Sequence, residues 1–443
     1  MRYEITGNVL QELDFTRVQS TSHGIFAVFS VEPVMTEKVL IIGAVWPESK
    51  SSAAGQNMAA LIKLFAARNY DIHFASAAAE SLHMDNDLLH ECALHAINLN
   101  DASFDTFVTQ LNPAIVIFDR FMTEEQFSAR VKKHCPDALH ILNTEDLHSL
   151  RHARHEAVKQ GGSANDAELN NAFSQREIAA ILRSDISLII SSAEYRLLID
   201  YYQVPEKQLQ LYPLQQPLTT PSELPDYPAR QHFITVGNFR HAPNWDAVLQ
   251  LKQFWPAIRA RIPDAELHIY GAYPPKKATQ LHNTKQGFVV KGWVDDIGQA
   301  MASARVCLAP LRFGAGIKGK LLTAMQYATP SVTTEVGAEG IASSEEWPGK
   351  VIELTEPAAF IDAACELYSV EALWQQASQQ AKTATVAYQG AQLQAQAALF
   401  EKITVARNDL PAFRQGLFLH SLMWHHSLRA SQFMSQWIEA KNR

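Results

Sequence analysis

A glycine-rich loop with two lysines is the segment of this chain whose residue types could do chemistry. The stretch FGAGIKGK covers residues 313–320, and its candidate contacts to a ligand are Gly314, Gly316, Lys318 and Lys320. Glycines let backbone N–H groups approach an anion closely, because no Cβ atom stands in the way. We expect a helix to start near Leu321, and the positive end of a helix dipole also favours an anion. The loop therefore predicts a binding site for a diphosphate.

Two familiar phosphate motifs come close to this loop without fitting it. Residues 314–320 spell GxxxxGK, but Leu321 follows where a Walker A loop needs Ser or Thr for magnesium. The glycines also spell GxGxxG, which belongs after the first strand of a dinucleotide domain, and this loop lies far downstream of such a strand. The alternative without function is that residues 313–320 form a surface turn with solvated lysines. The position of this loop after an expected strand and before an expected helix favours the anion site.

The first half of the chain alternates expected strands and helices. Residues 39–45 are a continuous apolar run, as in a strand that is buried on both faces. A small-residue loop that ends at Gly55 follows, and then a helix whose apolar residues recur at i, i+3, i+4 and i+7 from Met58. Residues 71–75 are the next expected strand, and the pattern repeats further on. Such alternation predicts a parallel sheet with helices on both faces.

Charged side chains gather where these expected strands end. Asp119 and Arg120 follow one apolar run, and Glu145, Asp146 and His148 follow another. Ligands of parallel sheets bind at the carboxyl ends of the strands, so these residues are candidates for a site. Adjacent residues at a helix start do not face each other, so we expect at most one of Glu145 and Asp146 to point into a cleft as a base.

Several of these residues also have an explanation that needs no function. His148 would cap its own helix, and Arg120 would pair with Asp119. Arg151 and Arg154 lie at successive turns of the same expected helix and would form a basic face that is exposed to solvent. Both interpretations stay open from the sequence alone.

A proline-rich segment separates the first half of the chain from the second. Residues 212–230, YPLQQPLTTPSELPDYPAR, cannot continue a helix or a central strand and are expected to form a semi-rigid linker. Beyond it the alternation of strands and helices restarts, with Asn244 as the expected N-cap of the first helix. Beyond residue 353 we expect helices to the end.

These patterns predict an α/β protein with two Rossmann-like domains that face each other across a cleft, followed by a C-terminal helical tail. The expected divisions are an N-terminal extension of unclear structure at 1–35, a first domain at 36–215, the linker at 216–231, a second domain at 232–390, and helices at 391–443 that cross back to the first domain.

Composition excludes several classes of function. The net charge of −8 and the pI near 6.1 argue against nucleic acid as a partner. The four cysteines are widely spaced, without a CxxC pair, which argues against a zinc ribbon or a disulfide framework. The triad His420, His425 and His426 lacks a converging geometry, so no metal site is expected there. We expect neither a signal peptide nor a membrane span, and therefore a cytoplasmic protein, with a peripheral membrane contact left open.

A resemblance to a known family covers residues 233–341. The segments VGNFRHAPNWDAV and VKGWVDDIGQAMASARVCLAPLRFGAGIKGKLLTAMQYATPSVTTEVGAEGI resemble the donor domain of retaining GT-B glycosyltransferases of the group 1, family 4-like type. The N-terminal segment PESKSSAAGQNM resembles the acceptor-side loop of that family more loosely. The resemblance implies sugar transfer from a nucleotide-sugar donor to a carbohydrate, lipid-linked or protein acceptor, without a metal or another cofactor.

The resemblance also implies roles for individual residues. It places the donor diphosphate on Gly237, Arg240, Gly314, Gly316, Lys318 and Lys320. It implies that Lys318 carries the leaving diphosphate, and it puts Thr323 or Glu339 near the donor ribose or sugar. From their places at the ends of expected strands and loops, we add His148 and Lys318 as catalytic candidates and Gly55 as a contact near the donor. Arg120, Asp146 and Arg151 are candidates for the acceptor side on the same positional grounds.

One departure from the family pattern concerns the ribose. Thr323 stands where many members carry a glutamate, and a threonine cannot match a charged bidentate acceptor. Either Glu335 or Glu339 takes over the ribose, or the donor binds weakly. Two other functions therefore stay open: a nucleotide-sugar 2-epimerase of the same architecture, and a protein that binds nucleotide-sugar without turnover.

Overall fold

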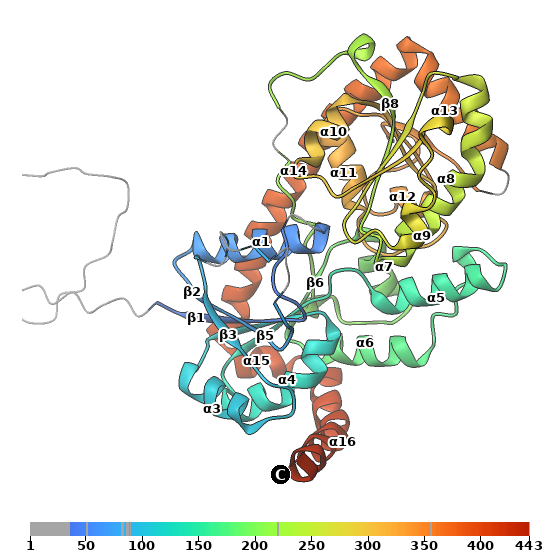
Figure 1. The fold of residues 1–443 in the computed structure, drawn as a ribbon. Helices are drawn as coiled ribbons and strands as arrows, with labels where there is room; N and C mark the ends of the chain where they lie inside the picture. The colour runs from blue at the N-terminus through green and yellow to red at the C-terminus, as the bar shows by residue number, and fades with distance from the viewer. Residues whose placement is uncertain are drawn as a thin grey trace, which may run out of the picture. The chain divides into compact units, whose positions relative to one another are not determined.

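The computed structural model describes residues 36–442 apart from residues 50–51, 81–83, 86–87, 89, 219–220 and 355–356. The expected N-terminal extension, residues 1–35, lies outside the described residues. Two parallel sheets, each flanked by helices, make up the remainder of the chain (Figure 1). The expected fold class is confirmed: two Rossmann-like α/β domains are followed by C-terminal helices.

The first sheet has the strand order β3-β2-β1-β4-β5-β6-β7. Its strands are β1 (Lys38–Gly43), β2 (Asp71–Ser76), β3 (Ala93–Ala96), β4 (Ile115–Asp119), β5 (Leu139–Asn143), β6 (Ile186–Ile189) and β7 (Leu209–Leu211). The helices that alternate with them are α1 (Ala53–Ala66), α3 (Ala102–Leu111), α4 (Phe121–His134), α5 (His148–Lys159), α6 (Ala172–Arg183) and α7 (Ser192–Asp200). All of the ladders between these strands are parallel.

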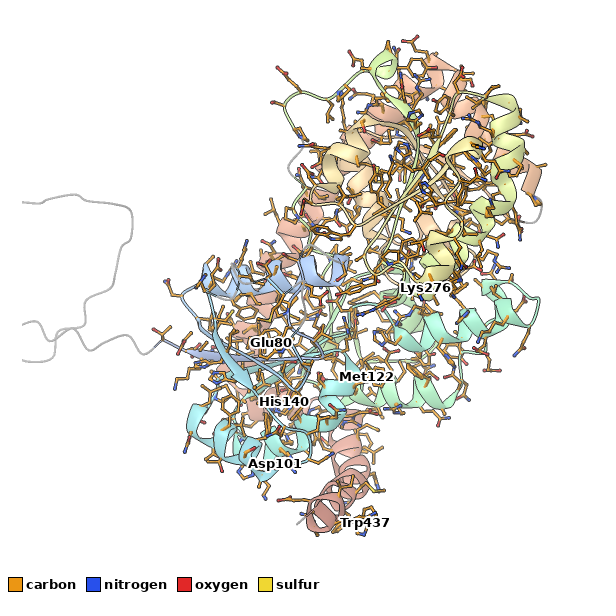
Figure 2. The ribbon with its side chains drawn as sticks, viewed as in Figure 1. Glu80, Asp101, Met122, His140, Lys276 and Trp437 are labelled. Atoms are coloured by element: carbon orange, nitrogen blue, oxygen red, sulfur yellow. The ribbon has the colours of Figure 1, made fainter. Side chains whose placement is uncertain are left out.

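Strong apolar runs explain the centre of this sheet. Successive residues of β1 and β4 point to opposite faces, and both faces are covered, one by a core that includes α1 and one by a core that includes α3 and α4. Met58 and Phe65 of the predicted helix stripe are buried in the first of these cores. Figure 2 shows the side chains that fill the space between the sheet and its helices, with His140 labelled on β5. The expected strand at residues 39–45 ends at Gly43.

The second sheet has the strand order β10-β9-β8-β11-β12-β13. Its strands are β8 (Gln231–Val236), β9 (Leu267–Tyr270), β10 (Phe288–Gly292), β11 (Ala304–Ala309), β12 (Ser331–Thr333) and β13 (Gly349–Val351). The helices among them are α8 (Ala242–Arg261), α9 (Lys276–Thr279), α10 (Ile297–Ser303), α11 (Gly319–Gln326), α12 (Glu335–Ala338) and α13 (Pro357–Ser369). These strands also pair in parallel.

Two helix starts differ from the expectation. Helix α8 begins at Ala242 with His241 as its N-cap, so the prediction of Asn244 as N-cap is wrong. The side chain of Asn244 instead donates a hydrogen bond to the Asn238 carbonyl, at 3.0 Å. Helix α11 begins two residues before Leu321, at Gly319, so the lysine loop leads directly into the helix.

The last helices connect the two sheets. They are α14 (Glu371–Asn408), α15 (Leu410–Gln415) and α16 (Phe418–Asn442). The first turns of α14 pack in the cores of the second sheet, through Trp374 and Ala381, and its last turns pack in a core of the first sheet, through Leu399 and Ile403 (Figure 1). The expected division between residues 390 and 391 falls inside this continuous helix.

Helix α16 lies against α6 and α4 of the first half. The indole of Trp424 donates to the Arg183 carbonyl at 2.9 Å, and His420 is buried beside Asp185. Trp437, labelled in Figure 2, lies on the same helix and is largely exposed. No helix among the described residues is long and apolar enough to cross a bilayer.

We expect Leu399→Ala to destabilise the protein strongly, because Leu399 is 0% exposed in a core that α14 shares with β1 and α1. Removing a buried leucine side chain costs about 2–5 kcal/mol. Leu393→Ala is the matched control, because Leu393 lies on the same helix and is 66% exposed. Urea denaturation should show a lower midpoint for the first variant and an unchanged midpoint for the second. Equal midpoints would contradict the packing of α14 on the first sheet.

Candidate active site

A cavity of about 570 Å³ lies between the carboxyl ends of the two sheets. Both halves of the chain line it, which fits the rule that ligands of open α/β sheets bind beyond the carboxyl ends of the strands. The predicted site residues that line it are Arg120, Asp146, His148, Arg151, Gly237, Arg240, Gly314, Lys318, Lys320 and Thr323. Three others, Gly55, Gly316 and Glu339, do not belong to the lining described.

The start of α11 presents unpaired donors to this cavity. Lys318 is the N-cap, and the first backbone N–H groups that bond back to its carbonyl are those of Leu321 and Leu322. The N–H groups of Gly319 and Lys320 therefore have no acceptor within the described part of the chain, as is usual for the first turn of a helix. The methyl group of Ala53 packs closely against Gly319: a Cβ at position 319 would lie only 2.7 Å from it. Such a helix start suits an anion.

Lys320 extends along the cavity wall toward α8. Its Nζ donates to Oδ1 of Asn244 at 2.6 Å, and burial lowers the pKa of this lysine to about 8. Asn244 packs so closely over Gly237 that a Cβ at Gly237 would lie 2.4 Å from the amide carbon. A side chain at position 237 would therefore displace Asn244, which positions Lys320. Gly237 thus has a structural role in addition to the predicted contact with phosphate.

Lys318 is buried and held by the loop itself. Its Nζ donates to the Gly316 carbonyl at 2.7 Å and lies 3.8 Å from Oε2 of Glu339. Burial lowers the pKa of Lys318, and the carboxylate of Glu339 opposes this effect. The ammonium group is therefore anchored in position at the cavity wall.

Glu339 has a different place from the one predicted. Both of its oxygens accept from the guanidinium of Arg154, at 2.7 and 2.8 Å. Burial alone would raise the pKa of Glu339, but the bonds from Arg154 and the charge of Lys318 outweigh it and lower the pKa. The prediction that Glu339 faces the donor ribose does not fit this arrangement, because both oxygens are engaged by Arg154 of α5 and one of them also lies near Lys318 of the loop. Glu335, the other carboxylate considered, is exposed and outside the cavity lining as described.

Arg154 connects the two halves of the chain. Besides Glu339, its guanidinium donates to the Gly314 carbonyl at 2.9 Å. The expectation of a solvent-exposed basic face with Arg151 is wrong, since both arginines are partly buried in ion pairs. The reason lies in the second half of the chain, whose loop covers this face of α5.

Gly316 contacts the first half of the chain rather than the cavity. Its φ of +62° favours glycine, and a Cβ there would lie 2.6 Å from Cβ of Asp146. Its N–H donates at 2.7 Å to Oε1 of Glu194, which also accepts from the Leu147 N–H at 3.0 Å. Sequence reasoning missed Glu194. Its place just after a predicted strand, where Asp119 and Asp146 were noticed, was the available signal.

Asp146 and His148 form a polar group on the opposite wall. Asp146 is ion-paired with Arg151, and its Oδ1 lies 3.4 Å from Nε2 of His148. Burial opposes ionisation of Asp146, but the Arg151 guanidinium outweighs it and holds the pKa of this carboxyl well below its usual range. Burial lowers the pKa of His148 to about 4, so the imidazole is neutral at pH 7. A neutral imidazole can accept or donate one hydrogen bond to a hydroxyl in the cavity.

His148 does not cap its helix with its side chain. Its backbone N–H donates to Oε1 of Glu177 at 2.9 Å, and Ser149 donates to the other oxygen of the same carboxylate. Glu177, from α6, therefore satisfies the start of α5 and leaves the His148 ring to the cavity.

Glu145 also lines the cavity, so the expectation that only one of Glu145 and Asp146 would do so is wrong. That expectation assumed helical geometry, whereas α5 starts at His148 and Glu145 has a φ of +56°. Its Oε1 accepts from Asn57 at 3.1 Å and from Asn143 at 3.0 Å. Burial raises the pKa of Glu145, and the nearby charge of Asp119 acts in the same direction.

Arg120 fits both interpretations that the sequence left open, the ion pair with Asp119 and a place in the site. Its Nε lies 3.9 Å from Oδ2 of Asp119, and the residue still lines the cavity. Its φ of +71° is rare for a non-glycine residue, and such strain gathers at functional sites. Its backbone N–H is fixed by the Asn143 carbonyl at 2.8 Å.

The outer wall holds Arg240, whose guanidinium lies 3.6 Å from the ring centroid of Tyr273. Glu48 reaches the same tyrosine, with its carboxylate 3.4 Å from the hydroxyl. Gly55 lies behind this wall: the backbone carbonyl of Glu48 would be 2.0 Å from a Cβ on Gly55. Gly55 therefore lets the loop before α1 fold onto the helix, and the predicted contact with the donor does not follow from its position.

Thr323 lines the cavity one turn into α11. Its hydroxyl donates to the Gly319 carbonyl at 3.0 Å, within its own helix, and Nε2 of Gln216 lies 3.4 Å away. The hydroxyl is thus partly engaged, and a longer side chain at this position would reach further into the cavity.

Comparisons with known proteins agree with this geometry. Residues 230–369 match the family model of Glycosyl transferases group 1. A search of curated protein sequences finds no match. The resemblance to group 1 glycosyltransferases that the sequence suggested is confirmed by this match. The matched residues include the lysine loop and α11.

Three solved structures show how far the fold likeness extends. Sucrose-phosphate synthase from Thermosynechococcus elongatus is 13% identical, with a TM-score of 0.64, and the match covers 84% of this chain and 100% of that one. A mutant of S. aureus TarM in complex with fondaparinux, α-GlcNAc-glycerol and UDP is 9% identical, with a TM-score of 0.64 and the same coverage. Anabaena HepE in complex with UDP and glucose is 11% identical, with a TM-score of 0.60, over 83% of this chain and 100% of that one.

At these identities the solved structures establish the fold alone. The chain has the fold of GT-B glycosyltransferases, and its residues 230–369 match the family model of group 1 glycosyl transferases.

Proposed function

We propose that this protein transfers a sugar from a nucleoside diphosphate sugar to a hydroxyl acceptor within the cavity between the two sheets. One observation carries the proposal: Lys318, Gly319 and Lys320, at the start of α11, all line the cavity. Two cations and a helix N-terminus match the two charged groups of a diphosphate. Arg240, on the outer wall, is a third cation for the same ligand.

The arrangement suits stabilisation of a leaving diphosphate. Negative charge develops on the phosphate oxygens as the sugar–phosphate bond breaks, and fixed cations stabilise that charge most when they need no rearrangement. Lys318 is fixed by Gly316 and Glu339, and Lys320 is fixed by Asn244. These side chains can neutralise the diphosphate without a metal ion, and we propose that transfer is metal-independent.

The opposite wall would receive the acceptor. The neutral ring of His148, oriented by Asp146, can hydrogen-bond a hydroxyl of the donor sugar or of the acceptor. Among the described residues of the cavity no side chain is an evident nucleophile, so we propose that the leaving diphosphate takes the proton of the attacking hydroxyl. Retention of the anomeric configuration rests on the resemblance to the retaining family.

The donor is proposed as a UDP-sugar first, because two of the similar structures carry UDP in their printed descriptions. The acceptor is proposed as a carbohydrate, a lipid-linked sugar or a protein. The functional test is a thermal-shift panel of UDP, GDP, ADP and their sugars, followed by product analysis with the donor that stabilises most. At about 100 times its dissociation constant a ligand adds about 2.7 kcal/mol of stability.

Product analysis also separates the alternatives. With the donor alone, an epimerase would form a new sugar nucleotide, whereas a transferase would form at most slow hydrolysis products. Transfer to a sugar acceptor should persist in EDTA at a temperature well below the melting temperature. Binding without any turnover, over a broad acceptor panel, would overturn the proposed transfer and leave a nucleotide-sugar binding protein.

We expect Lys318→Ala to weaken UDP binding far more than uridine binding, because only UDP carries the charges that this lysine would contact. A charge-assisted hydrogen bond is worth about 1.5–3 kcal/mol. Calorimetry on both ligands measures the difference, and Lys276→Ala is the control, since Lys276 is exposed at the start of α9. Equal losses for UDP and uridine would remove Lys318 from the phosphate site.

We expect UDP affinity to fall as the pH rises above about 8, because the Lys320 pKa is about 8 and the neutral amine no longer attracts phosphate. A full loss of one charged contact approaches a tenfold decrease per pH unit above the pKa. Lys320→Arg should flatten the decline, because arginine stays protonated over this range. Identical declines in both proteins would assign the titration to another group.

We expect Thr323→Glu to tighten nucleotide-sugar binding by about 1–2 kcal/mol, because a carboxylate accepts from both ribose hydroxyls and favours the positive helix end. Thr323→Gln is the matched control, with the same length and no charge. Tighter binding by the first variant alone supports a vacant ribose position under α11. Weaker binding by both variants would mean that the longer side chain crowds the donor against Gln216.

A further inference from the structure

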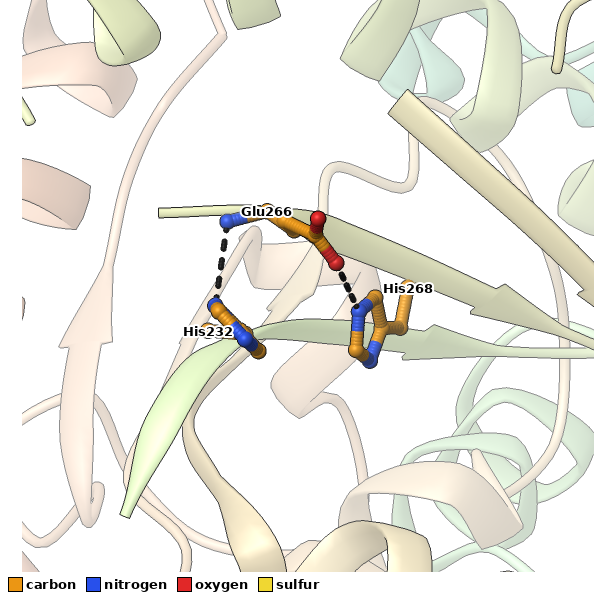
Figure 3. Close-up of side chains that lie close together, drawn as sticks. All are labelled: His232, Glu266 and His268. Carbon is orange, nitrogen blue, oxygen red and sulfur yellow. Dashed lines mark hydrogen bonds and ion pairs between the residues drawn. The ribbon is translucent and has the colours of Figure 1, made fainter. Parts of the chain in front are cut away.

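A second group of polar residues lies at the amino ends of β8 and β9, away from the cavity. It consists of His232, Glu266 and His268, which we call the histidine–glutamate cluster (Figure 3). One potential ligand atom from each side chain lies within 4.8 Å of the other two. All three residues are partly exposed, so an ion from solvent can reach them.

The fold brings these residues together by strand pairing. Glu266 and His268 are two positions apart at the start of β9, so their side chains leave the same face of the sheet. His232 lies at the start of the neighbouring strand, β8, which pairs in parallel with β9. Its φ of +64° is unusual for histidine, and its backbone N–H is held by the Tyr368 hydroxyl at 3.1 Å.

The bonds within the cluster show how its polar atoms are used. Nε2 of His268 lies 2.7 Å from Oε2 of Glu266, and the Glu266 N–H donates to Nδ1 of His232 over 3.2 Å (Figure 3). Nδ1 of His232 therefore carries no proton, and a metal ion bound there would replace the Glu266 N–H as the partner of its lone pair. Two imidazoles and a carboxylate that converge in this way are a ligand set preferred by Zn²⁺.

Two basic residues, Lys291 and Arg259, lie near His232 and weaken its attraction for a cation. Arg259 is already engaged with the Ala265 carbonyl.

We propose that His232, Glu266 and His268 bind a divalent transition-metal ion, with Zn²⁺ as the best match and water at the remaining position. Ligand atoms around tetrahedral zinc lie about 3.3 Å apart, given bonds of about 2.0–2.2 Å. The ligand atoms lie within 4.8 Å of one another, and Nε2 of His268 and Oε2 of Glu266 lie 2.7 Å apart, so binding an ion requires side-chain adjustment within the cluster.

The role of this ion would be structural. His232 lies four positions before Val236 on β8, and Val236 lines the cavity, so the two are about 13 Å apart along the strand. An ion there cannot touch the reacting atoms, and it would join the starts of β8 and β9. This inference does not depend on the proposed transfer, because its readouts are metal binding and thermal stability.

The test uses the full chain after treatment with a chelator and its removal. Zn²⁺ binding is followed by calorimetry, and Co²⁺ is added as a spectroscopic probe of tetrahedral coordination. We expect one zinc per chain and a higher melting temperature in its presence. His268→Ala, Glu266→Gln and His232→Asn should each lower zinc affinity by at least about 100-fold, since losing even a group behind a ligand costs 10–100-fold. Asparagine is chosen at position 232 because it tolerates positive φ.

The matched control addresses the other histidine pair. Nδ1 of His73 and Nε2 of His95 lie 2.9 Å apart in the first sheet, and this pair could hold zinc on its own. His95→Ala should leave the affinity and the melting shift unchanged. Zinc binding that is lost in His95→Ala but kept in His268→Ala would overturn the assignment, as would a wild-type chain that binds no zinc.

Discussion

One buried carboxylate ties together the two loops on which the cavity depends. Oε1 of Glu194 accepts from the N–H of Leu147, in the first half of the chain, and from the N–H of Gly316, in the lysine loop. Burial raises the pKa of Glu194, which shows what it costs to place a carboxyl group there. The two amide bonds offset that cost, because buried backbone donors also need partners. The lysine loop thereby gains a fixed position against Asp146 and the opposite wall.

Ion pairs compensate the other buried charges around Glu194. Arg154 and Glu339 neutralise each other across the two halves, and Arg151 neutralises Asp146. Against this background, Lys320 and Arg240 are cations of the cavity lining for which the described residues show no carboxylate partner. Buried ion pairs with good geometry contribute little net stability but are costly to break singly, so they favour one arrangement of the loops over others.

Much of this architecture was predictable from the sequence, and the limits have physical causes. Apolar runs such as that of β1 and the i, i+3, i+4 stripe of α1 depend on local periodicity, so the order of elements could be predicted. The lysine loop was found because glycines and lysines next to a helix start are a local pattern. Arg154, Glu339 and Glu194 have their partners more than one hundred residues away, and no spacing encodes such contacts. The histidine–glutamate cluster was missed for the same reason, since strand register brings His232 beside Glu266.

Helix α14 has a consequence for how the polypeptide acquires its structure during synthesis. Its last turns, together with Leu410, Phe413 and Leu417, complete a core whose other members all come from the first half of the chain, among them residues of β1, β2 and α1. The first half therefore cannot close this core while only its own residues have left the ribosome. It must wait, with apolar surface uncovered, until the second half has been made. Such a chain folds with a high contact order, and its two halves are expected to be interdependent in folding rather than sequential.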